Sequence, residues 1–297
     1  MTDRANNHAY GPDFLCIGMP KAGTAWLFDH LKDHPEFWMP PVKEISYLYN
    51  GSLNTENFSG KLEKTRRRLQ RDERRGNVWN EKQRCDLAFL EAGVACSEKT
   101  GDLGFYASLF RFKGRLKSGD ITPKYCLLDA EAVREFASVF PSAKIIFLVR
   151  EPVARTWSHI CLLLRNHELD ECVLTNPSMF RECLTMRDKL LEMSLATKIV
   201  SEWRERAPGL QFRHFFFDDI VQYPETVLRD IFVYLGADPD RTKRHIAPDY
   251  NRKAGEKKPE MSNEIRDILL EHLADEVRAC AAQLGGPARA WPAAYGL

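Results

Sequence analysis

The sequence predicts an α/β protein, folded as a three-layer sandwich with a mainly parallel sheet. Three short apolar runs carry this prediction, at residues 14–18, 144–150 and 210–217, and each is followed by a stretch with apolar residues at helical spacing. Such alternation is typical of parallel strands that are buried between two helical layers. With 297 residues, 44% of them hydrophobic, the chain is long enough to bury this core.

The first strand–helix unit begins at residues 14–18 (FLCIG), an apolar run that ends on glycine. Residues 19–23 are too rich in chain-breaking residues for regular structure. From Thr24 to about Lys32 the apolar residues follow helical spacing, and the His-Pro pair at 34–35 ends the helix. A strand, a tight loop and a helix in this order open a nucleotide-binding α/β unit.

The two later units follow the same pattern. Residues 144–150 (KIIFLVR) predict a strand that is apolar through its middle, and Pro152 suits the first turn of the helix that comes next. Residues 210–217 predict a further strand, and the helix near residues 224–235 ends at a glycine that suits a C-cap. We also expect a C-terminal helix over residues 261–285.

Residues 51–100 form a charged insertion that we expect to be helical. Within it, residues 61–75 (KLEKTRRRLQRDERR) contain eight basic and three acidic residues. Charge runs of this kind are usually solvated helix faces, and the alternative is a lid that attracts an anionic substrate. We see no internal repeat and no interdomain linker, so we interpret residues 1–297 as one domain.

Composition excludes several classes of function. The chain has 43 Lys and Arg against 42 Asp and Glu, which argues against a general nucleic-acid binder. No apolar run approaches the roughly 20 residues of a membrane helix, and residues 1–13 lack the apolar segment of a signal peptide. The eight cysteines include no C-x-x-C pair, which disfavours a metal site and favours reduced thiols. We expect a cytoplasmic protein without a membrane span, a bound metal or a nucleic-acid partner.

The loop after the first strand, residues 18–24 (GMPKAGT), has the chemistry of a phosphate loop. Backbone N–H groups at a helix N-terminus favour an anion, glycines let the backbone approach it closely, and Lys21 adds a positive charge. In the kinase pattern G-x-x-x-x-G-K-[ST] a lysine follows the second glycine, whereas here Thr24 follows Gly23 directly. The sequence therefore predicts a P-loop NTPase-like fold with an altered loop, the alternative being an ordinary Gly/Pro turn.

Several segments together resemble the PAPS-dependent sulfotransferases. Residues 19–24 resemble the 5′-phosphosulfate loop of that family. Residues 145–159 (IIFLVREPVARTWSH) resemble its 3′-phosphate motif, in which a serine follows the arginine at the strand end by eight residues. Residues 120–125 (DITPKY) resemble its acidic-x-[ST]-Pro-x-Tyr segment, and residues 214–236 its late strand–helix unit. The likeness covers most of the chain outside the charged insertion, and it is closest to the heparan-type and soluble bacterial-like branch.

The resemblance implies PAPS as the co-substrate and PAP as the product, and hence two anion sites that are a nucleoside apart. The arginine at the strand end and the helix serine suit the 3′-phosphate, because they supply a fork of donors and a hydroxyl. A late loop with glycine and lysines either closes over the nucleotide or stays solvated. The residues assigned to the nucleotide are Lys21, Ala22, Gly23, Thr24, Ala25, Arg150, Ser158, Lys257 and Lys258.

Sulfuryl transfer depends mainly on positioning and charge stabilisation, as loose phosphoryl transfer does. Lys21 is placed to neutralise charge on the leaving phosphate, and Glu44 occupies the position of the catalytic glutamate of the heparan-type branch. Rival bases are His30, His34 and His159. We expect the first two on a solvated helix face and the third packed in its helix.

Three departures from the heparan-type branch bear on the acceptor. Ile121 stands where that branch has a lysine, with Lys124 three residues later, and Tyr49 stands where it has an acid. The disulfide-bearing late loop is absent. These departures argue against a sulfated polysaccharide acceptor and favour a soluble enzyme acting on a smaller hydroxyl compound. The resemblance as a whole implies a sulfotransferase that moves the sulfuryl group from PAPS to a hydroxyl of a small-molecule or carbohydrate acceptor by in-line displacement, with a glutamate base. The alternatives are a P-loop nucleotide kinase or NTPase and a non-catalytic nucleotide-binding protein.

Overall fold

The computed structural model of the chain describes residues 10–95, 101–242 and 259–297. Within them, four parallel strands form one sheet in the order β2-β1-β3-β4. The strands are β1 (Phe14–Cys16), β2 (Gly119–Ile121), β3 (Lys144–Val149) and β4 (Gln211–Phe216). The three predicted strands are confirmed. The sequence did not predict β2, because its three residues, Gly-Asp-Ile, contain no apolar run.

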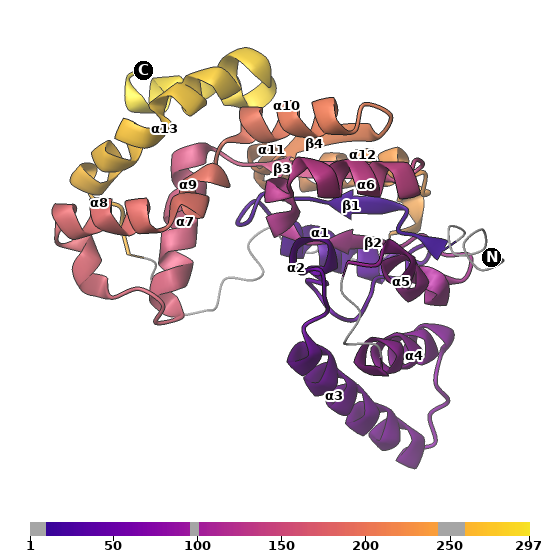
Figure 1. Ribbon diagram of the computed structural model, residues 1–297. Coiled ribbons are helices and arrows are strands. Elements are labelled where there is room, and N and C mark those ends of the chain that lie inside the picture. The colour runs from indigo at the N-terminus through magenta and orange to yellow at the C-terminus, as the bar shows by residue number, and fades with distance from the viewer. Residues whose placement is uncertain (1–9, 96–100, 243–258) are drawn as a thin grey trace.

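Helices cover both faces of the sheet (Figure 1). Helix α1 (Thr24–Asp33) follows β1, whereas α6 (Ala130–Val139) leads from β2 to β3, and α10 (Ala196–Arg206) precedes β4. Right-handed crossovers that run in opposite directions across a sheet lie on opposite faces, so α1 lies on one face and α6 and α10 on the other. Helix α12 (Pro224–Leu235) packs beside α1 through Phe232, whose ring centroid lies 4.4 Å from that of His34. The predicted three-layer α/β fold is confirmed.

The other predicted helices are also present. Helix α7 (Pro152–Arg165) begins at the expected proline, α12 ends at Gly236 with a φ of 74°, and α13 (Asn263–Gln283) lies inside the predicted range. The shorter helices are α2 (Tyr47–Asn50), α5 (Leu103–Ser108), α8 (Pro177–Met186), α9 (Asp188–Glu192) and α11 (Phe217–Gln222). Because all four strands are parallel, their carboxyl ends meet at one edge, where α/β sheets bind ligands.

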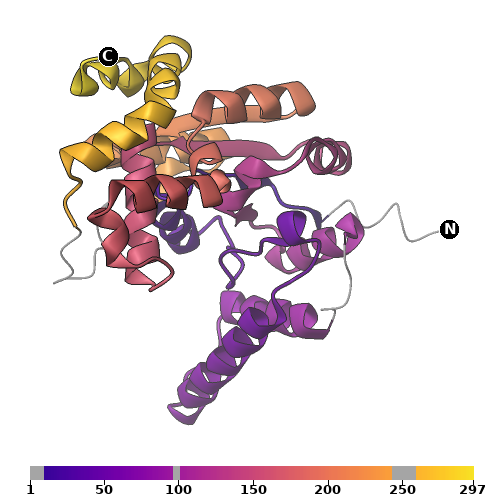
Figure 2. The ribbon, with the colours of Figure 1, turned by 60° about the vertical axis from the view of Figure 1, so that its left-hand side comes forward.

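The charged insertion forms an arm of two helices, α3 (Thr55–Arg74) and α4 (Glu81–Ala95), which projects from the sheet (Figures 1 and 2). Phe58 of α3 packs on Phe89 of α4, with ring centroids 5.5 Å apart. The eight basic side chains of residues 61–75 are all exposed. Among them, Arg66 pairs with Glu91 at 2.8 Å. The solvated helix that the sequence favours is therefore present, and a lid function of the arm stays a prediction.

Three further properties concern the described residues only. None of their helices combines the length and the apolar character that crossing a membrane requires. They contain no group of His, Cys, Asp and Glu side chains suited to a metal ion. Their seven cysteines form no disulfide.

The arm provides a matched pair of glycines that tests its packing. A Cβ on Gly93 of α4 would lie 2.3 Å from two ring atoms of the fully buried Phe58, whereas a Cβ on Gly60 of α3 would meet nothing within 4 Å. Helical Gly→Ala alone stabilises by about 0.5–1 kcal/mol, and overpacking costs about 1–3 kcal/mol. We expect Gly93→Ala to lower the free energy of unfolding in urea and Gly60→Ala to raise it. Stabilisation by both substitutions would contradict the packing of the arm.

Candidate active site

The loop between β1 and α1 places the N-terminus of α1 at the carboxyl edge of the sheet. Lys21 and Gly23 have φ values of 72° and 97°, in the left-handed region, so the loop turns sharply into the helix. Gly23 is the N-cap residue, and no side chain of the described residues caps this end. Among the described residues, no side chain therefore caps the positive end of the α1 dipole and its first turn contains no acidic residue, as an anion site requires.

Helix α7 differs from α1 at the same edge of the sheet. The carboxylate of Glu151 accepts hydrogen bonds from the backbone N–H groups of Val153 at 2.8 Å and Ala154 at 2.6 Å. The hydroxyl of Tyr295 donates to the same carboxylate at 2.8 Å. The N-terminus of α7 thus already holds an anionic group of the protein. Helix α11, directly after β4, also lacks a side-chain cap, but Asp218 and Asp219 in its first turn disfavour an external anion there, whereas the first turn of α1 contains no acidic residue.

Arg150 connects the end of β3 to this loop. Its Nη1 donates to the carbonyl oxygen of Lys21 at 2.8 Å, and its guanidinium carbon lies 4.5 Å from the ring centroid of Phe217. Helix α7 begins two residues later, and Ser158 lies two turns along it with 4% of its surface exposed. The structure therefore brings the predicted arginine directly against the predicted phosphate loop and places the predicted serine on the buried side of α7.

Asp120, at the middle of β2, holds the segment that carries Glu44. Its carboxylate is 1% exposed and accepts hydrogen bonds from the hydroxyls of Thr122 at 2.7 Å, Tyr125 at 2.7 Å and Tyr106 at 3.1 Å. The backbone N–H of Ile45 also donates to it. Burial raises the pKa of Asp120, and these donors oppose that rise.

The same hydroxyls also accept hydrogen bonds from the backbone after Glu44. The N–H of Ser46 donates to the Thr122 hydroxyl at 3.2 Å, and the N–H of Leu48 donates to the Tyr125 hydroxyl at 3.3 Å. One buried carboxylate thus fixes three backbone amides that follow the candidate base. The sequence showed the DITPKY motif but not this role, because the partners are more than 70 residues apart.

Glu44 is half-buried, and burial raises the pKa of its carboxyl group. The charges of Lys43 and Lys124 lower that pKa, and the charge of Asp120 raises it further. A raised pKa makes a carboxylate a stronger base while it remains ionised near neutral pH. Lys124 therefore lies close enough to Glu44 to act on it electrostatically.

The expectation of a solvated face for His30 and His34 was wrong. His30 is 4% exposed, and its Nδ1 lies 2.9 Å from the carbonyl oxygen of Trp26, whose ring it also contacts. His34 is 1% exposed; its Nε2 donates to the carbonyl oxygen of Asp238 at 2.9 Å and its Nδ1 accepts from the N–H of Glu36 at 3.2 Å. Aromatic packing and backbone hydrogen bonds keep both rings inside the fold, away from solvent.

His159 is held by Arg155, four residues earlier on α7. Arg155 is fully buried, and its Nη1 donates to the carbonyl oxygen of Leu190 at 2.8 Å and to the hydroxyl of Ser194 at 3.0 Å. Its Nη2 lies 2.5 Å from Nδ1 of His159. Burial and the charges of Arg155 and of Lys21 lower the pKa of His159 to about 4. A histidine whose Nδ1 faces a guanidinium is poorly suited to accept a proton.

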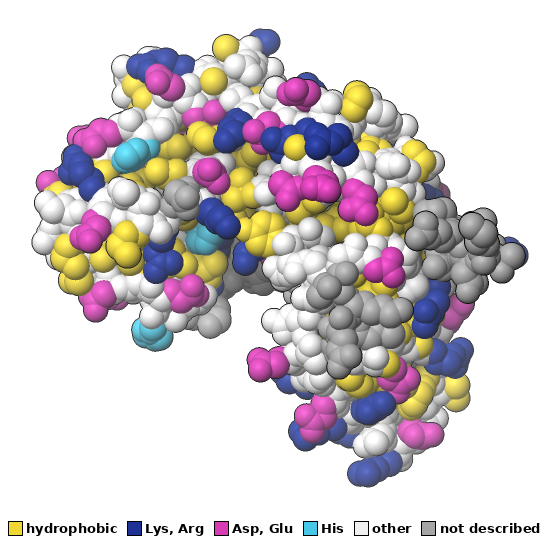
Figure 3. Space-filling model, viewed as in Figure 1, with side chains coloured by type: hydrophobic (Ala, Val, Ile, Leu, Met, Phe, Trp, Pro, Cys, Tyr) yellow, Lys and Arg dark blue, Asp and Glu magenta, His cyan; other side chains and the backbone are white. Residues whose placement is uncertain are grey.

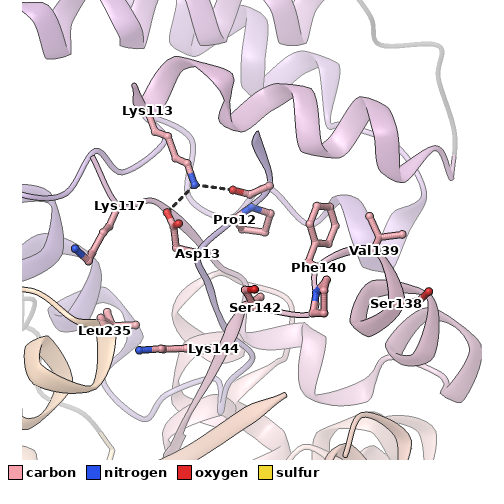
Figure 4. A pocket seen from close by; sticks show the side chains of 13 residues that line it. Pro12, Asp13, Lys113, Lys117, Ser138, Val139, Phe140, Ser142, Lys144 and Leu235 are labelled. Carbon is pink, nitrogen blue, oxygen red and sulfur yellow. Dashed lines mark hydrogen bonds and ion pairs between the residues drawn. The ribbon is translucent and has the colours of Figure 1, made fainter. Parts of the chain in front are cut away.

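A separate hollow of about 590 Å³ lies at the opposite, amino-terminal edge of the sheet (Figure 4). It is lined by Pro12, Lys113, Phe140 and Lys144 among others, and Lys113 pairs with Asp13 at 2.7 Å. The carboxyl edge of the sheet, with the phosphate loop, lies at the other end of the strands. The hollow is therefore separate from the candidate active site.

The surface is hollowed between the helices around α7 and α9 and the α3–α4 arm, and lysine and arginine side chains lie along its inner wall (Figure 3).

Two of the predicted nucleotide residues, Lys257 and Lys258, lie outside the described residues. The residues that sequence reasoning missed are Asp120, as an anchor, and Arg155. Each is a charged residue within an otherwise apolar or helical segment, and this was the one sequence signal that could have pointed to it.

Two tyrosines that donate to Asp120 allow its contribution to stability to be separated from its anchoring of the backbone after Glu44. Tyr106→Phe removes one hydrogen bond to the carboxylate, whereas Tyr125→Phe also leaves the N–H of Leu48 without its acceptor. We expect both variants to lose about 1–3 kcal/mol of unfolding free energy, because a buried partner is removed. Only Tyr125→Phe should also reduce turnover, measured as initial rate at saturating substrate. Equal turnover in both variants would show that the Leu48 contact does not support the base.

Comparisons with known proteins agree with this arrangement. A family model described as "Sulfotransferase family" matches residues 12–241. The chain is similar to a solved sulfotransferase from Alicyclobacillus acidocaldarius, at 20% identity and a TM-score of 0.62, over 94% of this chain and 98% of that one. It is also similar to the sulfotransferase domain from the curacin biosynthetic pathway, at 15% identity and a TM-score of 0.53, over 89% and 98%.

At these identities the two solved structures support the fold alone. No curated protein matches the sequence significantly. The family model, however, covers well over half of the chain, including the phosphate loop, the anchoring aspartate and the arginine at the end of β3. The chain therefore belongs to the sulfotransferase family.

Proposed function

We propose that this sulfotransferase takes the sulfuryl group from PAPS and transfers it to a hydroxyl group of a small-molecule or carbohydrate acceptor, releasing PAP. In this proposal Lys21 and residues 22–25 bind the 5′-phosphosulfate. Arg150 and Ser158 bind the 3′-phosphate, and Glu44 removes the proton of the acceptor hydroxyl.

The observation that carries the proposal is the N-terminus of α1 at the carboxyl edge of the sheet, compared with those of α7 and α11. Helix α11, after β4, has Asp218 and Asp219 in its first turn, whereas α1 has no acidic residue there. Helix α7 is closed by the carboxylate of Glu151, whereas α1 has no side-chain cap among the described residues. The left-handed turn through Lys21 and Gly23 directs the loop around that open end. An anionic group of the substrate would supply the cap that the protein does not.

The second anion site is supported by the position of Arg150. Its Nη1 is used by the carbonyl oxygen of Lys21, which ties the two sites together and orients the guanidinium. A guanidinium carries five N–H donors in a planar fork whose geometry matches a phosphate group. Ser158 follows on the buried side of the adjoining helix and adds a hydroxyl.

The proposed chemistry needs a base on one side of the transferred group and a cation on the other. Glu44, with its raised pKa, is held by amides anchored to Asp120, and this rigid support fixes the direction from which it approaches an acceptor hydroxyl. Lys21 stabilises the charge that grows on the leaving phosphate oxygen. The two groups act on opposite ends of an in-line displacement.

Nucleotide binding tests the proposal directly. We expect PAP to raise the melting temperature, and ATP with Mg²⁺ and ADP to have little effect, because they lack a 3′-phosphate. Arg150→Ala should weaken PAP binding by about 1.5–3 kcal/mol in isothermal titration, since it removes a charge-assisted contact.

Arg213→Ala is the matched control, because Arg213 lies on β4 in an exposed pair with Asp230 at 3.2 Å. This variant should keep the parental affinity for PAP. Unchanged affinity in Arg150→Ala would mean that the second anion site is misplaced, and stabilisation by ATP with Mg²⁺ in place of PAP would favour a kinase or NTPase.

Glu44 tests the chemistry separately from binding. Glu44→Gln should leave PAP affinity nearly unchanged and lower turnover by about 10²–10⁴-fold, the usual contribution of a general base. Lys21→Ala should lower turnover and also weaken PAPS binding. Because the base acts when ionised and its pKa is raised, parental turnover should fall with decreasing pH at a higher pH than an ordinary glutamate would cause. Loss of PAP binding in Glu44→Gln would instead assign the residue a structural role.

A further inference from the structure

Arg155 places a permanent positive charge in the interior beside His159. It is 0% exposed, and no carboxylate of the described residues pairs with it. Its Nη atoms are used by a carbonyl oxygen, by the hydroxyl of Ser194 and by the imidazole of His159. Its Nε is buried without a hydrogen-bond partner, so the three contacts of the Nη atoms are what offset the cost of burying the charge and what orient the guanidinium.

The bond to Arg155 determines which nitrogen of His159 carries the proton. A guanidinium has donors only, so Nδ1 of His159 must accept from Nη2. In the neutral ring the proton then resides on Nε2. Nδ1 contacts the buried Arg155, and the His159 side chain as a whole is half-buried. Across residues 10–95, 101–242 and 259–297, no protein group forms a hydrogen bond with Nε2.

The surroundings of His159 keep the ring neutral. Besides Arg155, the charged groups that act on it are Lys21 from the phosphate loop, Lys124 from the turn after β2 and Arg187 from the junction of α8 and α9. These cations come from four different elements, and together with burial they set its pKa at about 4. The ring therefore offers an uncharged N–H donor throughout the range in which the enzyme would work.

Two of these neighbours place His159 relative to the chemistry. Lys21 belongs to the proposed phosphosulfate site, and Lys124 acts electrostatically on both His159 and Glu44. His159 therefore lies within electrostatic reach of the phosphosulfate loop, on the helix that begins beside Arg150, whose Nη1 donates to the carbonyl oxygen of Lys21. We propose that Nε2–H of His159 donates a hydrogen bond to a sulfuryl oxygen of PAPS and that Arg155 is the positioning residue that orients the ring. This inference rests on the proposed function.

This role differs from that of a base and from that of Ser158, its neighbour on α7. As a donor to the sulfuryl group, His159 would contact PAPS but not PAP, which lacks that group. Burial and the four surrounding cations disfavour a charged imidazole, so the neutral N–H is the contribution of this side chain. Its contact would strengthen as negative charge redistributes over the sulfuryl oxygens during transfer.

The ring itself is tested first, in the unliganded parental protein labelled with ¹⁵N-histidine. We expect the His159 signals of a neutral ring with its proton on Nε2, unchanged from pH 8 to pH 5. A proton on Nδ1, or a titration near pH 6.5, would overturn the inference whether or not the protein is a PAPS enzyme.

The contact is tested with His159→Phe, which keeps the ring volume, and His159→Gln, whose amide N–H reaches toward the place of Nε2. We expect His159→Phe to lower kcat by about 10²-fold while its PAP dissociation constant stays within about threefold of the parental value. His159→Gln should recover part of the turnover. His272→Phe, at an exposed histidine of α13, is the control and should match the parent.

The remaining outcomes distinguish failure of the role of His159 from failure of the proposed function. Parental turnover in His159→Phe, or a joint loss of turnover and PAP affinity in both His159 variants, would overturn the role of His159 alone. If His159→Phe does not fold, His159→Gln and the labelling experiment decide. A parental protein that neither binds PAP nor transfers sulfate would overturn the proposed function, and this inference with it.

Discussion

The buried carboxylate of Asp120 is the constraint on which the candidate active site depends. It is almost fully excluded from solvent, and four donors satisfy it: three hydroxyls and the amide of Ile45. Removing a charge of this kind from water is costly, and these donors offset that cost. Because two of its hydroxyls also bind the backbone after Glu44, the position of that residue is fixed to β2 and thus to the sheet.

The carboxyl edge of the sheet concentrates positive charge in a protein of nearly zero net charge. Lys21, Lys124, Arg150, Arg155 and Arg187 come from five segments of the chain, and the sheet topology brings them to one region. Two acidic side chains there already bind backbone N–H groups: Glu151 caps α7, and Asp120 anchors the segment after Glu44. An excess of cations around an open helix N-terminus is the electrostatic complement of a substrate with several negative charges.

The α3–α4 arm has a different charge pattern from the site. Its basic residues are exposed, and some are paired within the arm, as Arg66 is with Glu91. Its packing rests on apolar contacts such as that of Phe58 with Phe89 and on the close approach permitted by Gly93. The basic residues of the arm are thus all exposed, whereas among the cations of the site Arg155 is buried, Lys21, Arg150 and Arg187 are half-buried, and Lys124 is exposed.

The sequence by itself determined the parallel α/β architecture, and it predicted an anion loop and a second anion site at an arginine and a serine. These features depend on local patterns: apolar runs, breakers and spacings of a few residues. The tertiary structure alone decided that β2 is a strand, that His30 and His34 are buried, and that Asp120 holds the Glu44 segment. It also decided that Arg155 sets the tautomer of His159. The physical reason is that burial and hydrogen bonding join residues such as Ser46 and Thr122, which are 76 positions apart, and no local pattern encodes such a contact.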